Sequence, residues 1–270
     1  MPTRLLAIDI DGTLLTSDRV PHPQNVAAIE KARAAGIIVV LASGRVGRSM
    51  RPFCDHLGLD GAMICCNGAH VEGLNGVELL HVTLGQLAVN ITLDYAEQIG
   101  VHVNAYTRGE LYFIGDSNWA EVYRQRVRAV TPLNATHEEV RHMKLLKLIL
   151  IDNPEAIQKH RKNLELLLSR EMAFLTESEP DYLEVLPPDA NKGRGLQVLS
   201  ESLGIPQSET AAIGDYLNDL EMVEWAGIGA AMGNAIDEVK SVANVVVQTN
   251  NEAGVAGFID YLLEKNEREG

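Results

Sequence analysis

The alternation of strand-like and helix-like segments at the start of the chain constrains its fold most strongly. Apolar runs of strand length are present at Leu5–Asp9, Ile37–Ala42 and Ala62–Cys66. The segments between them, Pro23–Ala35 and Gly44–Leu57, are expected to be helices. Because parallel strands are connected by crossover segments that are usually helical, this order predicts a βαβαβ unit and a parallel sheet.

The same alternation returns after Pro188, near the end of the chain. The expected helices are Asn191–Leu203, Leu217–Trp225 and Ala235–Ala243, and the expected strands are Thr210–Ile213, Gly227–Ala231 and Asn244–Val247. These segments have the same order of element types as the first part of the chain. The two ends of the chain are therefore predicted to form one α/β domain with a Rossmann-like parallel sheet.

The middle of the chain has a different pattern. Two strand-like runs, Val101–Tyr106 and Glu110–Ile114, are separated by a short turn and predict a β-hairpin. Further strands are expected at Lys144–Ile151, Met172–Glu177 and Tyr182–Leu186, and helices before the hairpin, at Ser117–Ala129 and at Pro154–Ser169. We therefore expect an α+β insert over residues 84–187, within a discontinuous core domain of residues 1–83 and 188–270.

Charge and cysteine content limit the function. The formal net charge is −14, which disfavours nucleic acid and anionic membranes as partners but allows a small phosphorylated metabolite in a locally positive cleft. No apolar stretch is long enough to span a bilayer, and no secretory signal is recognised. Three cysteines without metal-ligand spacing favour reduced thiols and a cytoplasmic protein. The oligomeric state is not indicated by the sequence.

Two aspartates, Asp9 and Asp11, lie at the end of the first predicted strand. The carboxyl ends of strands are where open α/β sheets bind ligands. Two carboxylates at such a point repel each other, and a hard divalent cation such as Mg²⁺ would offset this repulsion. Asp215, also at a strand end, is the expected third carboxylate of such a site.

The same residues suggest phosphoryl transfer. Asp9 could attack phosphorus directly and form an aspartyl phosphate. Asp11, two residues later, would protonate the leaving oxygen and then accept a proton from the attacking water. The alternative is structural, because an Asp-Gly pair such as Asp11-Gly12 is also common in turns.

Five further positions could support this chemistry. Ser43 and Gly44 end the second predicted strand, where a hydroxyl and backbone N–H groups can hold a phosphate. Lys192 could neutralise charge on the nucleophile, and Asn218 could donate to the phosphate. Asp219 is expected to orient Lys192 or metal-bound water. Each position also has a simpler interpretation, as a loop, capping or surface residue.

The order of these motifs is more specific than any one of them. An Asp-x-Asp-Gly-Thr motif, a serine at the next strand end, a lysine and a Gly-Asp-x-x-Asn-Asp motif follow one another along the chain. This order resembles the haloacid dehalogenase (HAD) superfamily. The resemblance covers the whole chain, since the insert lies where Cof-like phosphatases carry a large α+β cap of the C2 type. The segment Cys66-Asn67-Gly68-Ala69 is similar to a further pattern of that family.

This resemblance implies a role for each matching position. Asp9 would be the nucleophile and Asp11 the acid/base, with Mg²⁺ bound by Asp9, by Asp215 and by Asp11, the last through its backbone carbonyl. The phosphate contacts would come from the backbone of Ile10 and from Ser43, Gly44, Lys192 and Asn218. Arg45 could contact phosphate or form a salt bridge to the cap or to the edge of the sheet.

The sequence therefore predicts a Mg²⁺-dependent phosphatase that hydrolyses small phosphorylated metabolites, such as sugar phosphates. One alternative is a phosphomutase with the same nucleophile. A second is a phospho-accepting signalling receiver, which Asp11 and the large insert argue against. The substrate-contacting residues of the insert are not identified, because Tyr106, Tyr112, Asn118 and Tyr182 could equally be packing or surface residues.

Overall fold

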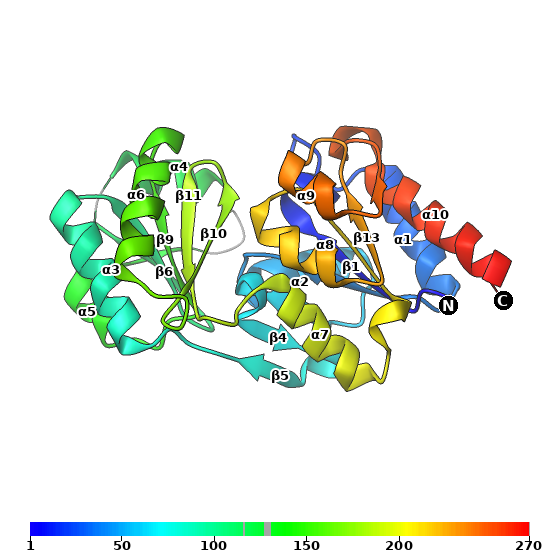
Figure 1. Ribbon diagram of the computed structural model, residues 1–270, viewed down its shortest axis with the longest axis horizontal. Helices are drawn as coiled ribbons and strands as arrows, with labels where there is room; N and C mark the ends of the chain where they lie inside the picture. The colour runs from blue at the N-terminus through cyan, green and yellow to red at the C-terminus, as the bar shows by residue number, and fades with distance from the viewer. Residues whose placement is uncertain (116, 127–130, 270) are drawn as a thin grey trace.

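Two sheets form the two halves of the molecule, which lie side by side along its long axis (Figure 1). The computed structural model describes residues 1–115, 117–126 and 131–269. Eight strands form one sheet, in the order β14-β13-β12-β1-β2-β3-β4-β5, and six form the other, in the order β10-β11-β9-β6-β7-β8. The chain belongs to the eight-stranded sheet at both ends and to the six-stranded sheet in between.

The eight-stranded sheet confirms the predicted parallel arrangement. Its strands are β1 (Leu5–Asp9), β2 (Ile38–Ala42), β3 (Met63–Cys65), β4 (His70–Glu72), β5 (Glu78–His81), β12 (Thr210–Gly214), β13 (Ile228–Ala231) and β14 (Val245–Val246). Strand β1 pairs in parallel with β2 on one side and with β12 on the other. Strands β4 and β5 extend the sheet with antiparallel pairing, which the alternation pattern did not predict.

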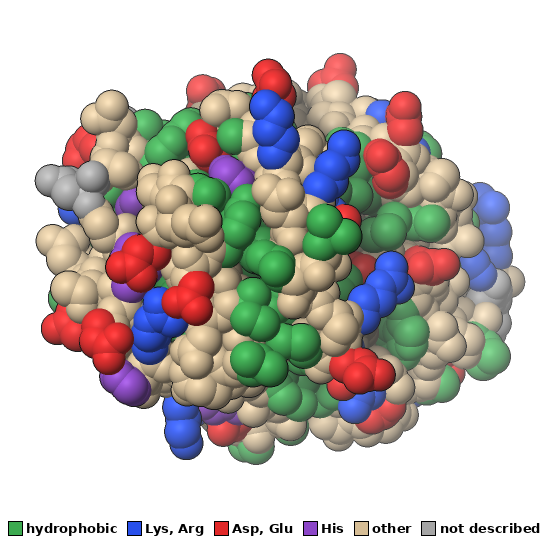
Figure 2. Space-filling model, turned by 60° about the vertical axis from the view of Figure 1, so that its left-hand side comes forward, with side chains coloured by type: hydrophobic (Ala, Val, Ile, Leu, Met, Phe, Trp, Pro, Cys, Tyr) green, Lys and Arg blue, Asp and Glu red, His purple; other side chains and the backbone are tan. Residues whose placement is uncertain are grey.

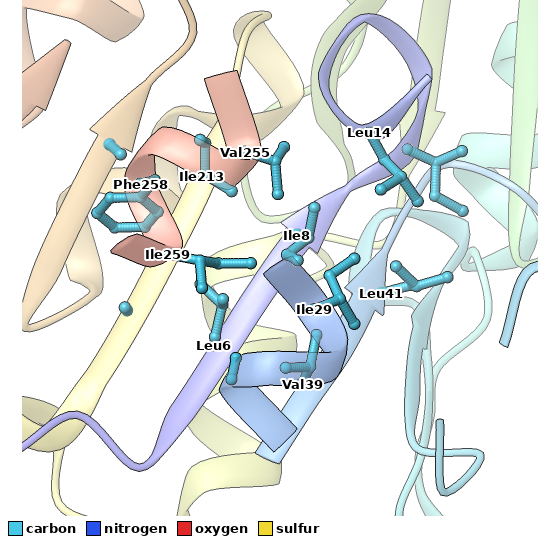
Figure 3. Packing of buried hydrophobic residues seen from close by; sticks show 14 of the residues in the cluster. Leu6, Ile8, Leu14, Ile29, Val39, Leu41, Ile213, Val255, Phe258 and Ile259 are labelled. Carbon is cyan, nitrogen blue, oxygen red and sulfur yellow. The ribbon is translucent and has the colours of Figure 1, made fainter. Parts of the chain in front are cut away.

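The core of this half follows from the alternation of side chains along β1. Leu6 and Ile8 point to one face and join a buried cluster with Ile29 and Phe258 (Figure 3). The cluster on that face includes residues of α1 (Pro23–Ala34), α2 (Gly47–His56), α9 (Asp237–Val242) and α10 (Gly254–Glu269). Leu5 and Ala7 point to the other face, towards α7 (Lys192–Leu203) and α8 (Leu220–Trp225). A fully buried central strand explains its continuous apolar sequence.

The six-stranded sheet is mainly antiparallel, as expected for the insert. Its strands are β6 (His102–Tyr106), β7 (Leu111–Ile114), β8 (Leu133–Ala135), β9 (Lys147–Ile151), β10 (Phe174–Glu179) and β11 (Tyr182–Leu186). The predicted hairpin is formed by β6 and β7, whereas β8 pairs with β7 in parallel. Residues of α3 (Gln86–Ile99), α5 (His137–Arg141) and α6 (Pro154–Leu167) join the apolar cluster on one face of the sheet.

Helix ends in this half follow local sequence rules. Asn153 caps α6 by accepting a hydrogen bond from the Ala156 N–H at 3.0 Å, and Pro154 occupies the first helical position, as predicted. The helix expected at Ser117–Ala129 is present as α4 (Asn118–Arg126), and residues 127–129 of that prediction lie outside the described residues.

On the face shown in Figure 2, acidic and basic side chains are interspersed.

Among the described residues, no helix combines the length and the apolar character that a bilayer crossing requires.

Candidate active site

The C-terminal ends of β1, β2 and β12 bring together residues that are far apart in the sequence. Asp9 ends β1, Ser43 follows β2, and Asp215 follows β12. After β1 the chain turns sharply at Gly12, whose φ of 80° is in the region that favours glycine. A side chain at Gly12 would also overlap the Asp215 carboxylate. The glycine of the Asp-x-Asp-Gly-Thr motif thus allows the two strand ends to approach.

Lys192 lies between two of these carboxylates. Its Nζ donates to Asp9 Oδ1 at 2.6 Å and to Asp219 Oδ1 at 2.5 Å, and the lysine is fully buried at the start of α7. Burial alone would lower the pKa of Lys192, but the charges of Asp219 and Asp9 outweigh it and raise the pKa above its usual value. Lys192 therefore remains positively charged in direct contact with Asp9.

Asp219 holds the loop after β12 in place as well as contacting Lys192. Its Oδ2 accepts hydrogen bonds from the backbone N–H groups of Asp215, at 2.9 Å, and of Tyr216, at 3.2 Å. Asp215 in turn accepts a hydrogen bond from the Thr13 hydroxyl at 2.8 Å. Any side chain at Gly214 would overlap Asp219. The loop after β12 and the turn after β1 are thus joined to one another.

Asp9, Asp215 and Asp219 form a carboxylate cluster. One oxygen of each lies within 4.8 Å of the others. Burial raises the pKa of Asp9 well above its usual range, and the Asp219 charge raises it further. Burial, followed by the Asp219 charge, raises the pKa of Asp215 to about 7. The single positive charge of Lys192 therefore does not offset the negative charges of all three carboxylates.

The cluster suits a divalent metal ion. Asp9 Oδ2 is buried and has no hydrogen-bond partner among the described residues. Oxygen-only donors are the ligands that hard cations such as Mg²⁺ prefer, and a bound cation would relieve the unfavourable ionisation of Asp9 and Asp215. These carboxylates therefore fit a metal site.

Asp11 lies apart from this cluster. Its carboxylate accepts two hydrogen bonds from Arg45, from Nε at 2.7 Å and from a terminal nitrogen at 2.6 Å, and Arg19 lies 3.8 Å away. Burial would raise the pKa of Asp11, but its hydrogen bonds with Arg45 and the Arg45 charge outweigh burial and lower it. The side chain of Asp11 is thus not among the grouped carboxylates. Arg45 does form a salt bridge, but with Asp11 rather than with the cap or the sheet edge.

Beside Asp9 and Asp11 there is a pocket between the two halves of the molecule, with about 710 Å³ of empty space including the solvent at its mouth. On the side of the eight-stranded sheet it is lined by Asp9, Asp11, Arg19, Ser43, Gly44, Arg45, Val46, Ser49 and Asn218. This lining includes five of the predicted site residues, Asp9, Asp11, Ser43, Gly44 and Asn218. Asp215 is not part of it. Lys192 and Ile10 are fully buried and are not part of it.

The opposite wall of the pocket comes from the insert. It is formed by Tyr106, Leu111, Tyr123, Lys147, Ile149, Ser178, Glu179, Tyr182 and Glu184. Of the four insert residues considered from the sequence, Tyr106 and Tyr182 line the pocket, whereas Tyr112 and Asn118 do not. Sequence reasoning missed Lys147 and Glu184, although a charged residue within an apolar strand was a signal that could have indicated them.

Comparison with known proteins identifies the family. A match to the haloacid dehalogenase-like hydrolases extends over residues 6–259. The chain belongs to this family. Pyridoxal phosphate phosphatase YbhA of Escherichia coli is 31% identical over 273 residues, covering 96% of this chain and 98% of YbhA. The 5-amino-6-(5-phospho-D-ribitylamino)uracil phosphatase YcsE of Bacillus subtilis is 32% identical over 262 residues, covering 95% and 94%.

Solved structures agree with this assignment. A haloacid dehalogenase-like hydrolase from Bacillus subtilis matches with a TM-score of 0.85 at 28% identity, covering 96% of this chain and 100% of that one. A second, from Bacteroides thetaiotaomicron, matches with a TM-score of 0.83 at 26% identity, covering 96% and 99%. The predicted family and fold are confirmed. The protein is a Cof-like HAD phosphatase, with a parallel-sheet core and an inserted α+β unit.

Proposed function

We propose that this HAD phosphatase hydrolyses small phosphorylated metabolites through an aspartyl phosphate on Asp9, with Mg²⁺ as its cofactor. The observation that carries the proposal is the environment of Asp9. Lys192 holds Oδ1, whereas Oδ2 has no hydrogen-bond partner among the described residues, and Asp9 lines the pocket. A carboxylate that lines a pocket, is oriented by a lysine and keeps one oxygen free for a metal ion is suited to nucleophilic attack through its other oxygen.

In the proposed reaction, Asp9 attacks the phosphorus atom and displaces the alcohol oxygen of the substrate. Asp11 protonates that oxygen as it leaves, and then accepts a proton from the water that hydrolyses the acyl phosphate. Because Arg45 now holds Asp11 and lowers its pKa, the carboxyl must exchange this salt bridge for the leaving oxygen before it can donate. This exchange makes Arg45 a positioning residue for the acid.

The metal would be held by the carboxylates of Asp9 and Asp215, with the backbone carbonyl of Asp11 as the third ligand. Bound Mg²⁺ would offset the negative charge of the carboxylates and of the phosphoryl group. We further propose that Ser43, the backbone of Gly44 and of Ile10, Asn218 and Lys192 bind the phosphate oxygens. Ser43 and Asn218 are buried beside the pocket, which suits positioned donors.

Residues 84–187 are proposed to act as a cap that excludes bulk water and selects the leaving group, moving about linkers near Thr83 and Pro187. Within the part of the chain that the structure describes, ion pairs link this segment to the rest of the molecule at its surface. They are Arg108–Glu78 at 3.0 Å, Arg19–Glu179 at 3.7 Å and Arg48–Glu110 at 3.7 Å. Exposed ion pairs are individually weak, which is compatible with reversible opening.

The relatives are named as phosphatases, and this favours hydrolysis over the mutase alternative. Phosphate release from a panel of phosphorylated metabolites, with Mg²⁺ and with a chelator, tests the proposal. Asp9→Asn should lower turnover by at least about 10⁴-fold, because removal of a nucleophile abolishes the covalent route. Asp260→Asn, an equivalent change at an exposed position on α10, is the control. Full turnover by Asp9→Asn, or an isomerised product without free phosphate, would contradict the proposal.

A further inference from the structure

The face of the six-stranded sheet that lines the pocket carries a buried pair of opposite charges. Side chains alternate along β9 and β11, so that Leu148, Leu150, Leu183 and Val185 join the apolar cluster with α3 and α6. The alternate positions face the other half of the molecule, and among them are Lys147 and Glu184. Both are only 1% exposed.

The contacts of this pair are unequally distributed between the two oxygens of Glu184. Oε2 accepts hydrogen bonds from Lys147 Nζ at 2.6 Å and from Asn67 Nδ2 at 2.8 Å. Oε1 is buried and has no hydrogen-bond partner among the described residues. The Lys147 ammonium also lies 4.6 Å from the centre of the Tyr106 ring. One acceptor of the pair is therefore unused.

The unused acceptor lies beside the proposed phosphate-binding loop. A methyl group placed on Gly44 would be 3.3 Å from Glu184 Oε1 and 3.2 Å from Lys147 Nζ. Asn67, which contacts Glu184, accepts a hydrogen bond from Asn218 at 3.0 Å. Polar contacts thus run without interruption from Asn218, in the eight-stranded half, to the charged pair of the insert.

A buried pair of this kind contributes little to the stability of the fold. Removing two charges from water costs more than their attraction returns in many proteins, and apolar residues would pack at least as well. Its neighbours on the pocket side, Tyr106, Ile149 and Tyr182, are apolar or aromatic. A group that binds within the pocket would make use of both the donor and the unpaired acceptor.

We propose that Lys147 and Glu184 recognise hydroxyl groups of the leaving alcohol, and that they select phosphate monoesters of neutral polyhydroxylated alcohols. This inference rests on the proposed function, because it assigns the leaving-group side of the same pocket. A hydroxyl can donate to Glu184 Oε1 and accept from Lys147 Nζ, and the carbon skeleton would pack against Tyr106 and Tyr182.

The charge of the pair decides between classes of substrate. Lys147 and Glu184 together carry no net charge, and the unpaired Oε1 would repel a second anionic group. Phosphorylated carboxylic acids and bisphosphates should therefore be poor substrates. Monoesters without a hydroxyl would leave the acceptor unpaired and should also react slowly.

The test compares glucose 6-phosphate with its 2-deoxy and 3-deoxy analogues, with phenyl phosphate and with 3-phosphoglycerate. For the wild-type protein we expect kcat/KM for glucose 6-phosphate to exceed that for at least one deoxy analogue by about 10-fold or more. In Glu184→Gln the ratio of kcat/KM for glucose 6-phosphate to that for the deoxy analogue should fall to about 1, because the charged acceptor that binds the hydroxyl is gone. A purely structural role would lower all the rates together and would leave the ratio unchanged.

Glu184→Gln leaves the buried Lys147 ammonium without a charged partner and could unfold the chain. The double variant Lys147→Met with Glu184→Gln removes both charges, and circular dichroism checks that it is folded. The control is Glu177→Gln, because Glu177 is also buried in the insert and paired with Arg161, but does not line the pocket. Its deoxy ratio should match that of the wild type.

The possible outcomes separate this inference from the proposed function. Loss of the ratio in the double variant but not in Glu177→Gln supports it. An unchanged ratio in the double variant, or a wild-type preference for 3-phosphoglycerate or phenyl phosphate over glucose 6-phosphate, overturns it while leaving the phosphatase proposal intact. If the wild type released phosphate from no monoester in the panel, the proposed function itself would be wrong.

Discussion

The two walls of the pocket carry their charged residues in different ways. On the eight-stranded side, acidic residues are grouped in loops at the ends of parallel strands, and Lys192 offsets only part of their charge. On the insert side, Lys147 and Glu184 lie within strands and neutralise each other, and Glu179 at the end of β10 pairs with Arg19 of the other half. The first arrangement is suited to binding a cation and a phosphate, and the second to binding neutral groups. The eight-stranded side is therefore suited to the reaction itself, and the insert side to the choice of substrate.

The largest expected effect on stability is that of Lys192→Met, which tests whether the eight-stranded side depends on the buried Lys192 cation. Asp9 and Asp219 would lose their shared partner, and we expect the free energy of unfolding to fall by about 3–5 kcal/mol without Mg²⁺. Turnover should fall by at least about 10²-fold. Urea unfolding and phosphate release measure the two effects.

The matched control is Lys159→Met, which removes an exposed lysine paired with Glu155 on α6. This change should alter the free energy of unfolding by less than about 0.5 kcal/mol. If Lys192→Met were equally mild, the charge-balance account of the carboxylate cluster would be wrong.

The next effect is that of Mg²⁺ on stability. The pKa of Asp215 is raised to about 7, so the folded protein retains a proton that the unfolded chain releases. Metal-free protein should therefore lose stability as the pH rises from about 4 towards 7. Added Mg²⁺ should reverse this loss and stabilise the fold by about 2.7 kcal/mol at 100 times its dissociation constant.

Thermal unfolding measured at pH 5 and pH 8, with and without Mg²⁺, checks the expected sign. The stabilisation by Mg²⁺ should be larger at pH 8, because protons compete with the metal for the carboxylates at pH 5. Stabilisation that is equal at both pH values would argue against ionisation of the cluster on metal binding.

A smaller effect is expected for Arg45→Met. Arg45 lowers the pKa of Asp11, and without it that pKa should rise. Because Asp11 must carry a proton to act as the acid, the decline of kcat on the alkaline side should move to higher pH by about one unit. Arg48→Met, at an exposed position in the first turn of α2, should leave the profile unchanged. A profile of Arg45→Met identical to that of the wild type would remove Arg45 from the mechanism.

The smallest effect concerns two tyrosines of the insert. Tyr106 lines the pocket, and its hydroxyl contacts that of Tyr123, whereas Tyr112 does not line the pocket. Tyr106→Phe should lower the free energy of unfolding by about 1 kcal/mol. Tyr112→Phe should change it by less than about 0.5 kcal/mol. Chemical denaturation of the two variants compares them, and the opposite order would contradict this assignment.

The comparison also explains which parts of the site the sequence could predict. Asp9 ends a strand of the parallel sheet, Ser43 and Asp215 each follow one, and the carboxyl ends of such strands lie at one edge. Chain order alone therefore predicts that they meet. The bidentate contact between Arg45 and Asp11 was not predictable in this way, because side-chain direction within a loop depends on tertiary packing.

The insert was predictable as a set of elements but not as part of the site. A lysine at the start of β9 and a glutamate within β11 are compatible with a solvent-exposed sheet face. Only the position of the other half of the molecule makes that face buried. Helix α10 was also missing from the predicted elements, although Val255, Phe258, Ile259 and Leu262 have helical spacing.

The position of β1 between β2 and β12 has a consequence for synthesis of the protein on the ribosome. Asp9 leaves the ribosome well before Lys192 and Asp219, which complete its surroundings and follow about two hundred residues later. The six-stranded sheet, by contrast, is made from one continuous segment and can form as soon as that segment has emerged. A nascent chain can thus contain a folded insert while β1 still lacks β12 as its second neighbour, and the phosphatase gains its reactive centre only after the segment that follows the insert has been made.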